Sequence, residues 1–151
     1  MATDAADSET DGFTAAERDA MRQRAAELRA EGRKGAKKAD ALQACLDRIA
    51  SMEGTDRVLA ERVHATVTSH APDLAPKTWY GMPAYADAAG KVVIFFQDAG
   101  KFEARYASLG FNDTALLDDG DMWPTSFALV AWNDDVEARI AELVRAAVSA
   151  A

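Results

Sequence analysis

The stretch that decides the fold is K-T-W-Y-G-M-P-A-Y, residues 77–85, which holds three aromatic side chains, one glycine and one proline. All but one of the twelve aromatic residues lie in the second half of the chain, so we expect the core to be built there. Pro83 has no amide donor and favours extended backbone at the residue before it. We therefore predict a short strand, residues 79–82, that ends at a sheet edge and places Trp79 and Tyr80 on opposite faces.

Length, charge and cysteine content restrict the class of protein. A chain of 151 residues suits one domain with a hydrophobic core. The net charge of −8 argues against a general nucleic-acid binder, which needs a basic face. Cys45 is the sole cysteine, which excludes an internal disulfide and a cysteine-based metal site within one chain. With no secretory signal and no apolar run of membrane-spanning length, we expect a cytoplasmic protein without a membrane partner, as a monomer or weak homodimer.

The N-terminal region combines an acidic tail with a polar helix. Residues 1–12 are small, polar and acidic, so we expect a disordered tail, followed by a single domain over residues 13–151. Thr14 and Glu17 form a capping-box pattern that predicts a helix running to about Glu31. This helix has few large apolar residues, so we expect it to lie at the periphery of the domain.

Two further helices are predicted after a short basic segment. The run G-R-K-G-A-K-K, residues 32–38, is interpreted as a solvated linker, with an RNA or anionic-lipid patch as the alternative. Asp40 is predicted to cap a second helix with an apolar stripe, which Gly54 ends. Thr55 is predicted to cap a third helix that stops before Pro72.

After Pro76 the sequence pattern changes from helical periodicity to strands. Four strands are predicted, over residues 79–82, 91–97, 101–109 and 125–132. Short connections at 87–90 and 98–100 predict antiparallel hairpins. The run V-V-I-F-F is apolar on both faces and should be central. In the third strand, alternation predicts that one face is buried, namely Phe102, Ala104 and Tyr106.

The chain then closes with an acidic loop and a last helix, for which Asn133 is the predicted N-cap. Together these patterns predict an α+β fold in two layers. We expect a four-stranded antiparallel sheet covered on one face by helices, with a peripheral N-terminal helix.

Three motifs resemble a known family. At W-Y-G-M-P-A-Y (79–85), K-F-E-A-R-Y-A-S-L-G-F (101–111) and L-D-D-G-D-M-W-P (117–124), the sequence is similar to the YdhG-like family of bacterial domains of unknown function. The resemblance covers about residues 13–149 and implies a single small α+β domain with helices packed on an antiparallel sheet. One branch of that family has been proposed as a frataxin-like intracellular iron chaperone. The resemblance therefore implies iron, or another divalent cation, as a candidate cargo, and no catalytic residues are carried over.

Standard catalytic motifs are absent from the sequence. It contains no G-x-S-x-G, no G-x-x-x-x-G-K-[ST], no H-E-x-x-H and no C-x-x-C. An enzyme of unrecognised class acting on a small molecule stays open as an alternative, but no reaction is indicated.

The first candidate site is an aromatic and basic face in the second half of the chain. Aromatic rings beside a guanidinium and an ammonium suit a small anionic or planar ligand, through stacking and charge-assisted hydrogen bonds. The alternative is that these rings fill the core between sheet and helices. The candidate ligand-binding residues are Trp79, Tyr80, Tyr85, Lys101, Arg105, Tyr106 and Trp123.

The second candidate site is the acidic loop, with Asp118, Asp119 and Asp121 as metal ligands and Asp113 upstream. Clustered carboxylates suit a hard cation such as calcium, magnesium or ferrous iron. The alternative is a solvated turn in which an aspartate caps backbone amides.

Taken together, the sequence predicts a non-catalytic binding domain for a small anionic ligand or a metal ion, and the resemblance adds an iron-chaperone-like role. A protein-interaction module is a further alternative. A deep pocket with paired carboxylates would favour an enzyme. An aromatic groove or an acidic ridge would favour a binding domain, and a flat apolar patch would favour an interaction module.

Overall fold

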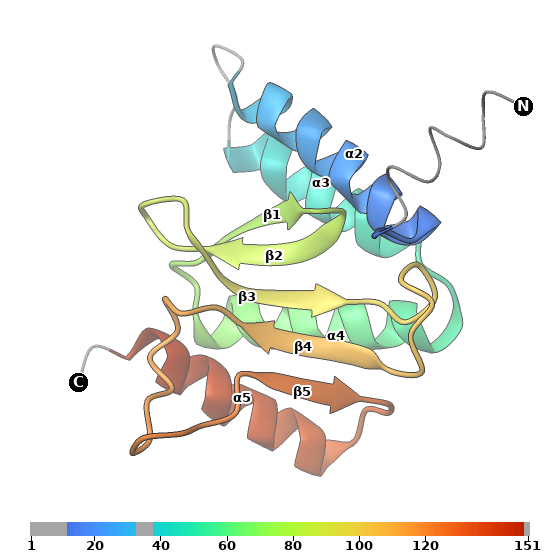
Figure 1. The fold of residues 1–151 in the computed structure, drawn as a ribbon. Helices are drawn as coiled ribbons and strands as arrows, with labels where there is room; N and C mark the ends of the chain where they lie inside the picture. Colours follow the sequence, from blue (N-terminus) through green and yellow to red (C-terminus); the bar gives the residue numbers. More distant parts are fainter. Residues whose placement is uncertain (1–11, 33–37, 150–151) are drawn as a thin grey trace, which may run out of the picture.

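The computed structural model describes residues 12–32 and 38–149. The expected disorder of the acidic tail and the expected basic linker fall almost entirely on residues 1–11 and 33–37, outside the described residues. Within the described ranges the chain forms four helices and five strands (Figure 1): α2 (Ala15–Glu31), α3 (Lys38–Ala50), α4 (Gly54–His70), β1 (Ala75–Trp79), β2 (Met82–Ala86), β3 (Val92–Gln97), β4 (Ala107–Phe111), β5 (Ser126–Leu129) and α5 (Asp134–Val148). The α+β class is confirmed.

The five strands form one antiparallel sheet in the order β1-β2-β3-β4-β5, so each strand pairs with its neighbour in sequence. The prediction that V-V-I-F-F is central is confirmed, because β3 is the middle strand. In the view of Figure 1, α4 and α5 lie behind the strands, while α2 and α3 lie together beside β1. An antiparallel sheet covered by helices is therefore confirmed, with five strands where four were predicted.

The additional strand comes from a turn within the stretch that the sequence marked as decisive. The predicted strand 79–82 is wrong, because Tyr80 and Gly81 form the two-residue loop of a hairpin between β1 and β2. Both residues have positive φ, 53° and 76°, as a type I′ hairpin loop requires, and glycine adopts this conformation at no steric cost. Trp79 and Met82 pair across the loop. The glycine in W-Y-G-M was thus a turn signal.

The predicted strand 101–109 is also wrong in its first six residues. β4 begins at Ala107, and Ala104 and Tyr106, which were expected in the core, are exposed. The Asp56 carboxylate accepts the amide N–H groups of Ala99 (3.1 Å) and Gly100 (2.9 Å), and so holds the connection after β3 in a loop. Residues 98–106 therefore form a long connection where the sequence predicted a tight hairpin.

Helix capping follows the sequence at two ends and departs from it at three others. Thr14 caps α2 in a complete capping box with Glu17, and the Asn133 side chain accepts the Val136 amide at the start of α5, as predicted. Gly54 begins α4 and does not end α3, and the predicted cap Thr55 lies inside α4, whose N-cap residue is Glu53. Asp40 lies in the first turn of α3, where an acidic side chain complements the helix dipole, and is not its N-cap.

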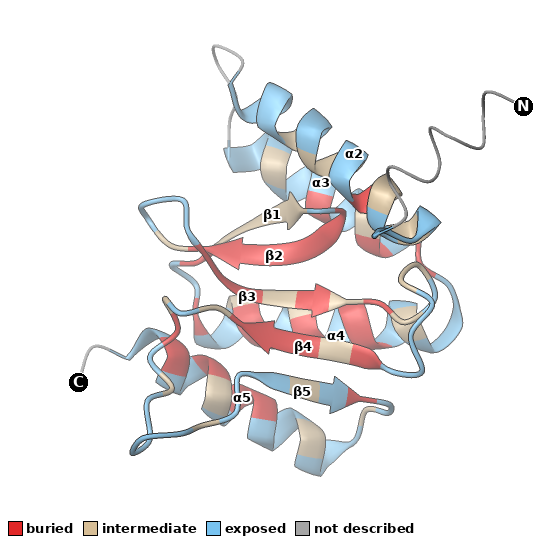
Figure 2. Ribbon diagram, viewed as in Figure 1, coloured by how far each residue is buried: buried red, intermediate tan, exposed pale blue. Residues whose placement is uncertain are grey.

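The hydrophobic core lies between α3, α4, α5 and one face of the sheet. Its largest fully buried side chains include Tyr85, Phe96, Ile94 and Leu109 from the strands, together with residues of the helices: Cys45, Leu59, Val63, Val67 and Val144. Figure 2 shows that the inner strands are mostly buried, whereas α2 is mostly exposed. Ala20 is the one buried residue of α2, so the predicted peripheral helix is borne out.

The opposite face of the sheet is defined by the register. Lys77, Ala84, Phe95, Gly110 and Ser126 lie in one row across the five strands, and they alternate with the residues that point into the core. The Phe95 ring covers Gly110, where an added Cβ would lie 2.1 Å from its Cζ atom. Trp79 packs on Phe95 with ring centroids 5.3 Å apart. This aromatic pair lies close to α2, and the candidate site is built around it.

Candidate functional site

α2 presents a polar stripe at four-residue spacing, which places one side chain per turn on the same face: Asp19, Gln23, Glu27 and Glu31. The Glu27 carboxylate accepts hydrogen bonds from the backbone amides of Tyr80 and Gly81, both at 3.0 Å. The hairpin loop between β1 and β2 thus binds a carboxylate supplied by the chain's own helix. Charge-assisted bonds of this kind are about twice as strong as neutral ones.

Two lysines of the sheet layer pair with the same stripe. Lys77 of β1 pairs with Glu31. Lys101, after β3, lies 3.3 Å from Asp19 and also donates to Gln23. Burial and the nearby positive charge of Arg48 lower the pKa of Lys101, while Asp19 acts in the opposite direction. Because α2 buries one alanine and little else, these hydrogen bonds and ion pairs are what attach it to the sheet.

Beside this contact lies a cavity of about 350 Å³, which we call the α2 groove. Its walls come from α2, β1, the turn between β2 and β3, and the loop after β4, and they consist of Arg24, Lys77, Trp79, Gly90, Lys91, Val92, Asn112, Asp113 and Thr114. Three cations from three separate segments therefore face one cavity together with an indole ring. Asp113 is the one carboxylate among its described lining residues, so the groove holds no carboxylate pair.

Among the described residues, Arg24 is the one of these three cations with a buried donor that makes no hydrogen bond. Its guanidinium lies over the Tyr80 ring, 5.7 Å from the centroid. The Nη1 atom is 3.5 Å from Glu27 and 3.7 Å from Glu31. Within the described part of the chain, this buried nitrogen has no hydrogen-bond partner. Buried donors are nearly always paired, so Arg24 keeps an unused hydrogen-bond donor beside the groove.

The structure brings together only part of the predicted aromatic face. Trp79 lines the α2 groove, Tyr80 stacks under Arg24, and Lys101 pairs with α2 next to the hairpin loop. The other four residues lie elsewhere. Arg105 stacks on Tyr106, 5.1 Å from the ring centroid, and both are exposed on the connection before β4. Trp123 is half-buried in the loop before β5 and Tyr85 belongs to the core, so none of the four lines the groove.

Tyr85 takes part in a polar chain through the core instead. Its hydroxyl lies 2.9 Å from His64 Nδ1 and hydrogen-bonds with Cys45. Burial raises the pKa of the Cys45 thiol to about 11 and raises the pKa of Tyr85 well above its ordinary value. Burial lowers the pKa of His64. The thiol is therefore an unreactive core group, because the thiolate is the nucleophilic form.

The acidic loop gives no assembled metal site. Asp118, Asp119 and Asp121 are all exposed. Across residues 12–32 and 38–149, no group of three or more His, Cys, Asp or Glu side chains is placed to hold a metal ion. Binding of iron or another divalent cation by this loop stays a prediction from the sequence.

Sequence reasoning missed four of the residues that matter most, namely Arg24, Glu27, Lys77 and Lys91. Arg24 and Glu27 belong to the helix that the sequence predicts to be peripheral. The four-residue repeat of acidic and amide side chains in α2 was the one available signal, since such a stripe can face a row of donors. Lys77 lies within β1 and Lys91 directly precedes β3, and nothing in their local sequence distinguishes them from other surface lysines.

Comparisons with known proteins do not identify a family for this chain. No family model matches the chain, and neither the curated proteins nor the solved structures contain a match. Within the described residues, no helix is both long enough and apolar enough to cross a membrane.

Proposed function

We propose that this domain is a non-catalytic binding module for a small anionic ligand with a planar apolar group, bound in the α2 groove. The observation that carries the proposal is that Arg24, whose buried Nη1 atom makes no hydrogen bond within the described residues, lines a cavity together with two further cations. The cavity volume of about 350 Å³ falls in the range of small-molecule sites.

Each lining group has a distinct part in this proposal. Trp79 offers an aromatic face for the planar part of the ligand. Arg24 donates to the anionic group with fixed geometry, and Lys77 and Lys91 add positive charge. Lys91 is exposed and forms no ion pair with any described residue, so its charge is the least compensated of the three.

Glu31 opposes ligand binding in this arrangement. Its carboxylate pairs with Lys77 and lies 3.7 Å from Arg24, so it occupies the position that a ligand anion would take. A bound anion must displace it or share its cations. The proposal therefore predicts that loss of the Glu31 charge strengthens ligand binding, which an ordinary surface ion pair would not do.

The test is an NMR titration of the whole chain with phenyl phosphate and benzoate, following the Arg24 Nε and Trp79 indole N–H signals. Benzamide, which has the same ring without the charge, serves as the neutral control. We expect saturable shifts at both positions with the anions. Lys91→Gln should weaken the affinity roughly threefold to tenfold, and Glu31→Gln should increase it by a similar factor.

Arg57→Gln is the matched control, because Arg57 lies on α4 in an exposed pair with Glu61 and should leave the affinity unchanged. Equal affinity for benzamide and benzoate would show that the anionic group does not contribute to binding, and the proposal of an anionic ligand would be wrong. Unsaturable shifts at Arg24 and Trp79 with both anions would refute binding in the groove.

A further inference from the structure

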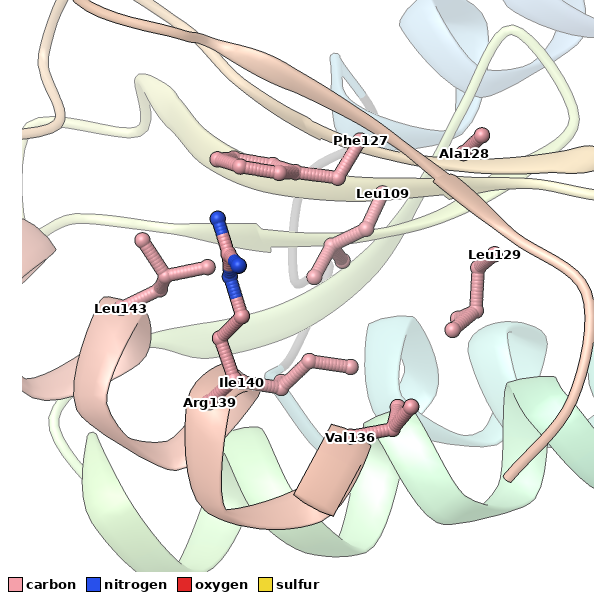
Figure 3. Close-up of a pocket in the computed structure, with 8 residues that line it drawn as sticks. All are labelled: Leu109, Phe127, Ala128, Leu129, Val136, Arg139, Ile140 and Leu143. Carbon is pink, nitrogen blue, oxygen red and sulfur yellow. The ribbon is translucent and has the colours of Figure 1, made fainter. Parts of the chain in front are cut away.

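A second cavity lies at the other edge of the sheet, between β5 and α5 (Figure 3). It has a volume of about 290 Å³, and we call it the Arg139 cavity. Its lining is almost wholly apolar and consists of Leu109, Phe127, Ala128, Leu129, Val136, Arg139, Ile140 and Leu143. Because β1 and β5 are opposite edges of the sheet, this cavity is separate from the α2 groove.

The rim of the Arg139 cavity is open to ligands, whereas its floor belongs to the core. Leu109, Leu129 and Ile140 are buried. Phe127 and Leu143, which pack against the core cluster, are half-buried, as is Val136. An apolar group that entered between them would remove these partly exposed side chains from water, which is favourable.

Arg139 is the one charged residue among the described groups that line this cavity. Its guanidinium lies over the Phe127 ring, 5.7 Å from the centroid, and Figure 3 shows it directed toward that ring. Asp135 and Glu142 stand four residues before and three residues after it on the same helix, where ion pairs commonly form. Within the described ranges, however, Arg139 forms an ion pair with neither of them.

This combination specifies the ligand chemistry. An apolar cavity takes an apolar chain, and an uncompensated guanidinium at its rim takes a carboxylate, which it can bind through two parallel hydrogen bonds. We propose that the Arg139 cavity binds a small amphipathic carboxylic acid, with its hydrocarbon chain among Leu109, Ile140 and Leu143 and its carboxylate on Arg139. The site uses no residue of the α2 groove, so it stands or falls independently of the function proposed above.

The experiment is an isothermal titration of the full chain with octanoate, with octan-1-ol as a neutral probe of the same length and butyrate as a short one. We expect saturable binding of octanoate, and binding of octan-1-ol and butyrate weaker by about tenfold or more. In a parallel NMR titration, the methyl signals of Ile140 and Leu143 should shift while the Trp79 indole signal stays in place.

Two variants test the site from different sides. Arg139→Gln removes the charge from an exposed position and should weaken octanoate binding by about tenfold, while Arg139→Lys should retain part of the affinity. Val136→Phe fills the cavity and should abolish binding of octanoate. The control is again Arg57→Gln, which should bind octanoate as the wild type does. Circular dichroism and thermal melting establish that each variant is folded.

Several results would overturn the proposal. Absence of saturable octanoate binding would do so, as would equal affinity for octanoate and octan-1-ol, or wild-type affinity in Arg139→Gln. If light scattering showed a dimer that Val136→Phe disrupts and octanoate leaves intact, the cavity would be an interface with a second copy of the chain, and the proposal would again be wrong.

Discussion

The two faces of the sheet contact the surrounding helices through different kinds of interaction. On the core face, Tyr85, Phe96 and Leu109 are at most 1% exposed and pack against α3, α4 and α5. On the opposite face, α2 is attached mainly through Glu27 on two backbone amides and through ion pairs with two lysines. One face is a dry apolar core, and the other is a polar contact between a helix and a hairpin loop.

This difference separates stability from binding. Burial of apolar surface is favourable without regard to direction, and it sets the free energy of unfolding of the whole domain. Hydrogen bonds and ion pairs are directional, and they compete directly with water, salt and ligand anions. We therefore expect the core face to determine whether the chain folds, and the α2 face to determine which ligands bind in the α2 groove.

Two adjacent phenylalanines allow a direct test of this comparison, and they give the largest expected effect. Phe96 is fully buried on the core face, whereas Phe95 is half-buried on the α2 face. Phe96→Ala should lower the free energy of unfolding by about 3–5 kcal/mol. Phe95→Ala should lower it by about 1–2 kcal/mol, because much less apolar surface is removed from the interior. Urea denaturation of both variants measures the two values.

The same pair shows how the comparison can fail. If Phe95→Ala were as destabilising as Phe96→Ala, the α2 face would be a second core, and binding there could not be remodelled independently of folding. Ligand titration provides a second readout. Phe95→Ala should weaken the affinity for phenyl phosphate, because Phe95 supports Trp79, whereas a destabilised but folded core variant such as Val63→Ala should leave it unchanged.

The next effect is smaller and local, and it concerns Glu27. Glu27→Gln keeps the size of the side chain but turns one of its two acceptor oxygens into a donor, which cannot accept the amide of Tyr80 or Gly81. We expect the free energy needed to open α2 away from the sheet to decrease by about 1–2 kcal/mol. Hydrogen exchange should then be faster at these two amides and along α2, while exchange in β3 stays as in the wild type.

The matched control for this prediction is Glu61→Gln. Glu61 forms an exposed pair with Arg57 on α4, with both side chains about half exposed, and its loss should change stability by less than about 0.5 kcal/mol. Faster exchange throughout the sheet in Glu27→Gln would show that α2 is part of the folding core, contrary to the comparison. Unchanged exchange at Tyr80 and Gly81 would show that the carboxylate contributes nothing to docking.

The core face was largely predictable from sequence, because its signals are periodic and local. The apolar stripe of α5, its Asn133 N-cap and the two-sided apolar run of β3 each depend on residues within a few positions of one another. The hairpin loop at Tyr80 and Gly81 was missed for a physical reason. Tyrosine at positive φ is uncommon, and the aromatic run around it favours a strand.

The binding face was mostly unpredictable because it depends on contacts between distant segments. Glu27 and Gly81 are separated by 54 positions, and nothing in either local sequence indicates that they meet. Three of the predicted ligand-binding residues lie at or near α2, namely Trp79, Tyr80 and Lys101. Trp79 directly precedes the hairpin loop, Tyr80 lies in that loop, and Lys101 lies in the connection after β3. Arg105 and Tyr106 were placed by assuming a strand where the chain forms a loop, so the predicted burial of Tyr106 was wrong.

The last prediction concerns the polar chain within the core face and is the smallest in effect. His64, on α4, shares a hydrogen bond between its Nδ1 atom and the Tyr85 hydroxyl. Burial lowers the pKa of His64 below its ordinary value of 6.5. As the pH falls below 6.5, the unfolded chain therefore takes up a proton that the folded chain binds less readily, and the free energy of unfolding decreases. At neutral pH His64 is uncharged in both states and this contribution vanishes.

The measurement is urea denaturation at pH 7.5, 6.5 and 5.5 for the wild type and for His64→Gln. The variant should lose less stability than the wild type between pH 7.5 and 5.5. A pH dependence that is identical in wild type and His64→Gln would show that the chain from His64 to Cys45 is not coupled to folding, and the core face would then be insensitive to pH in this range.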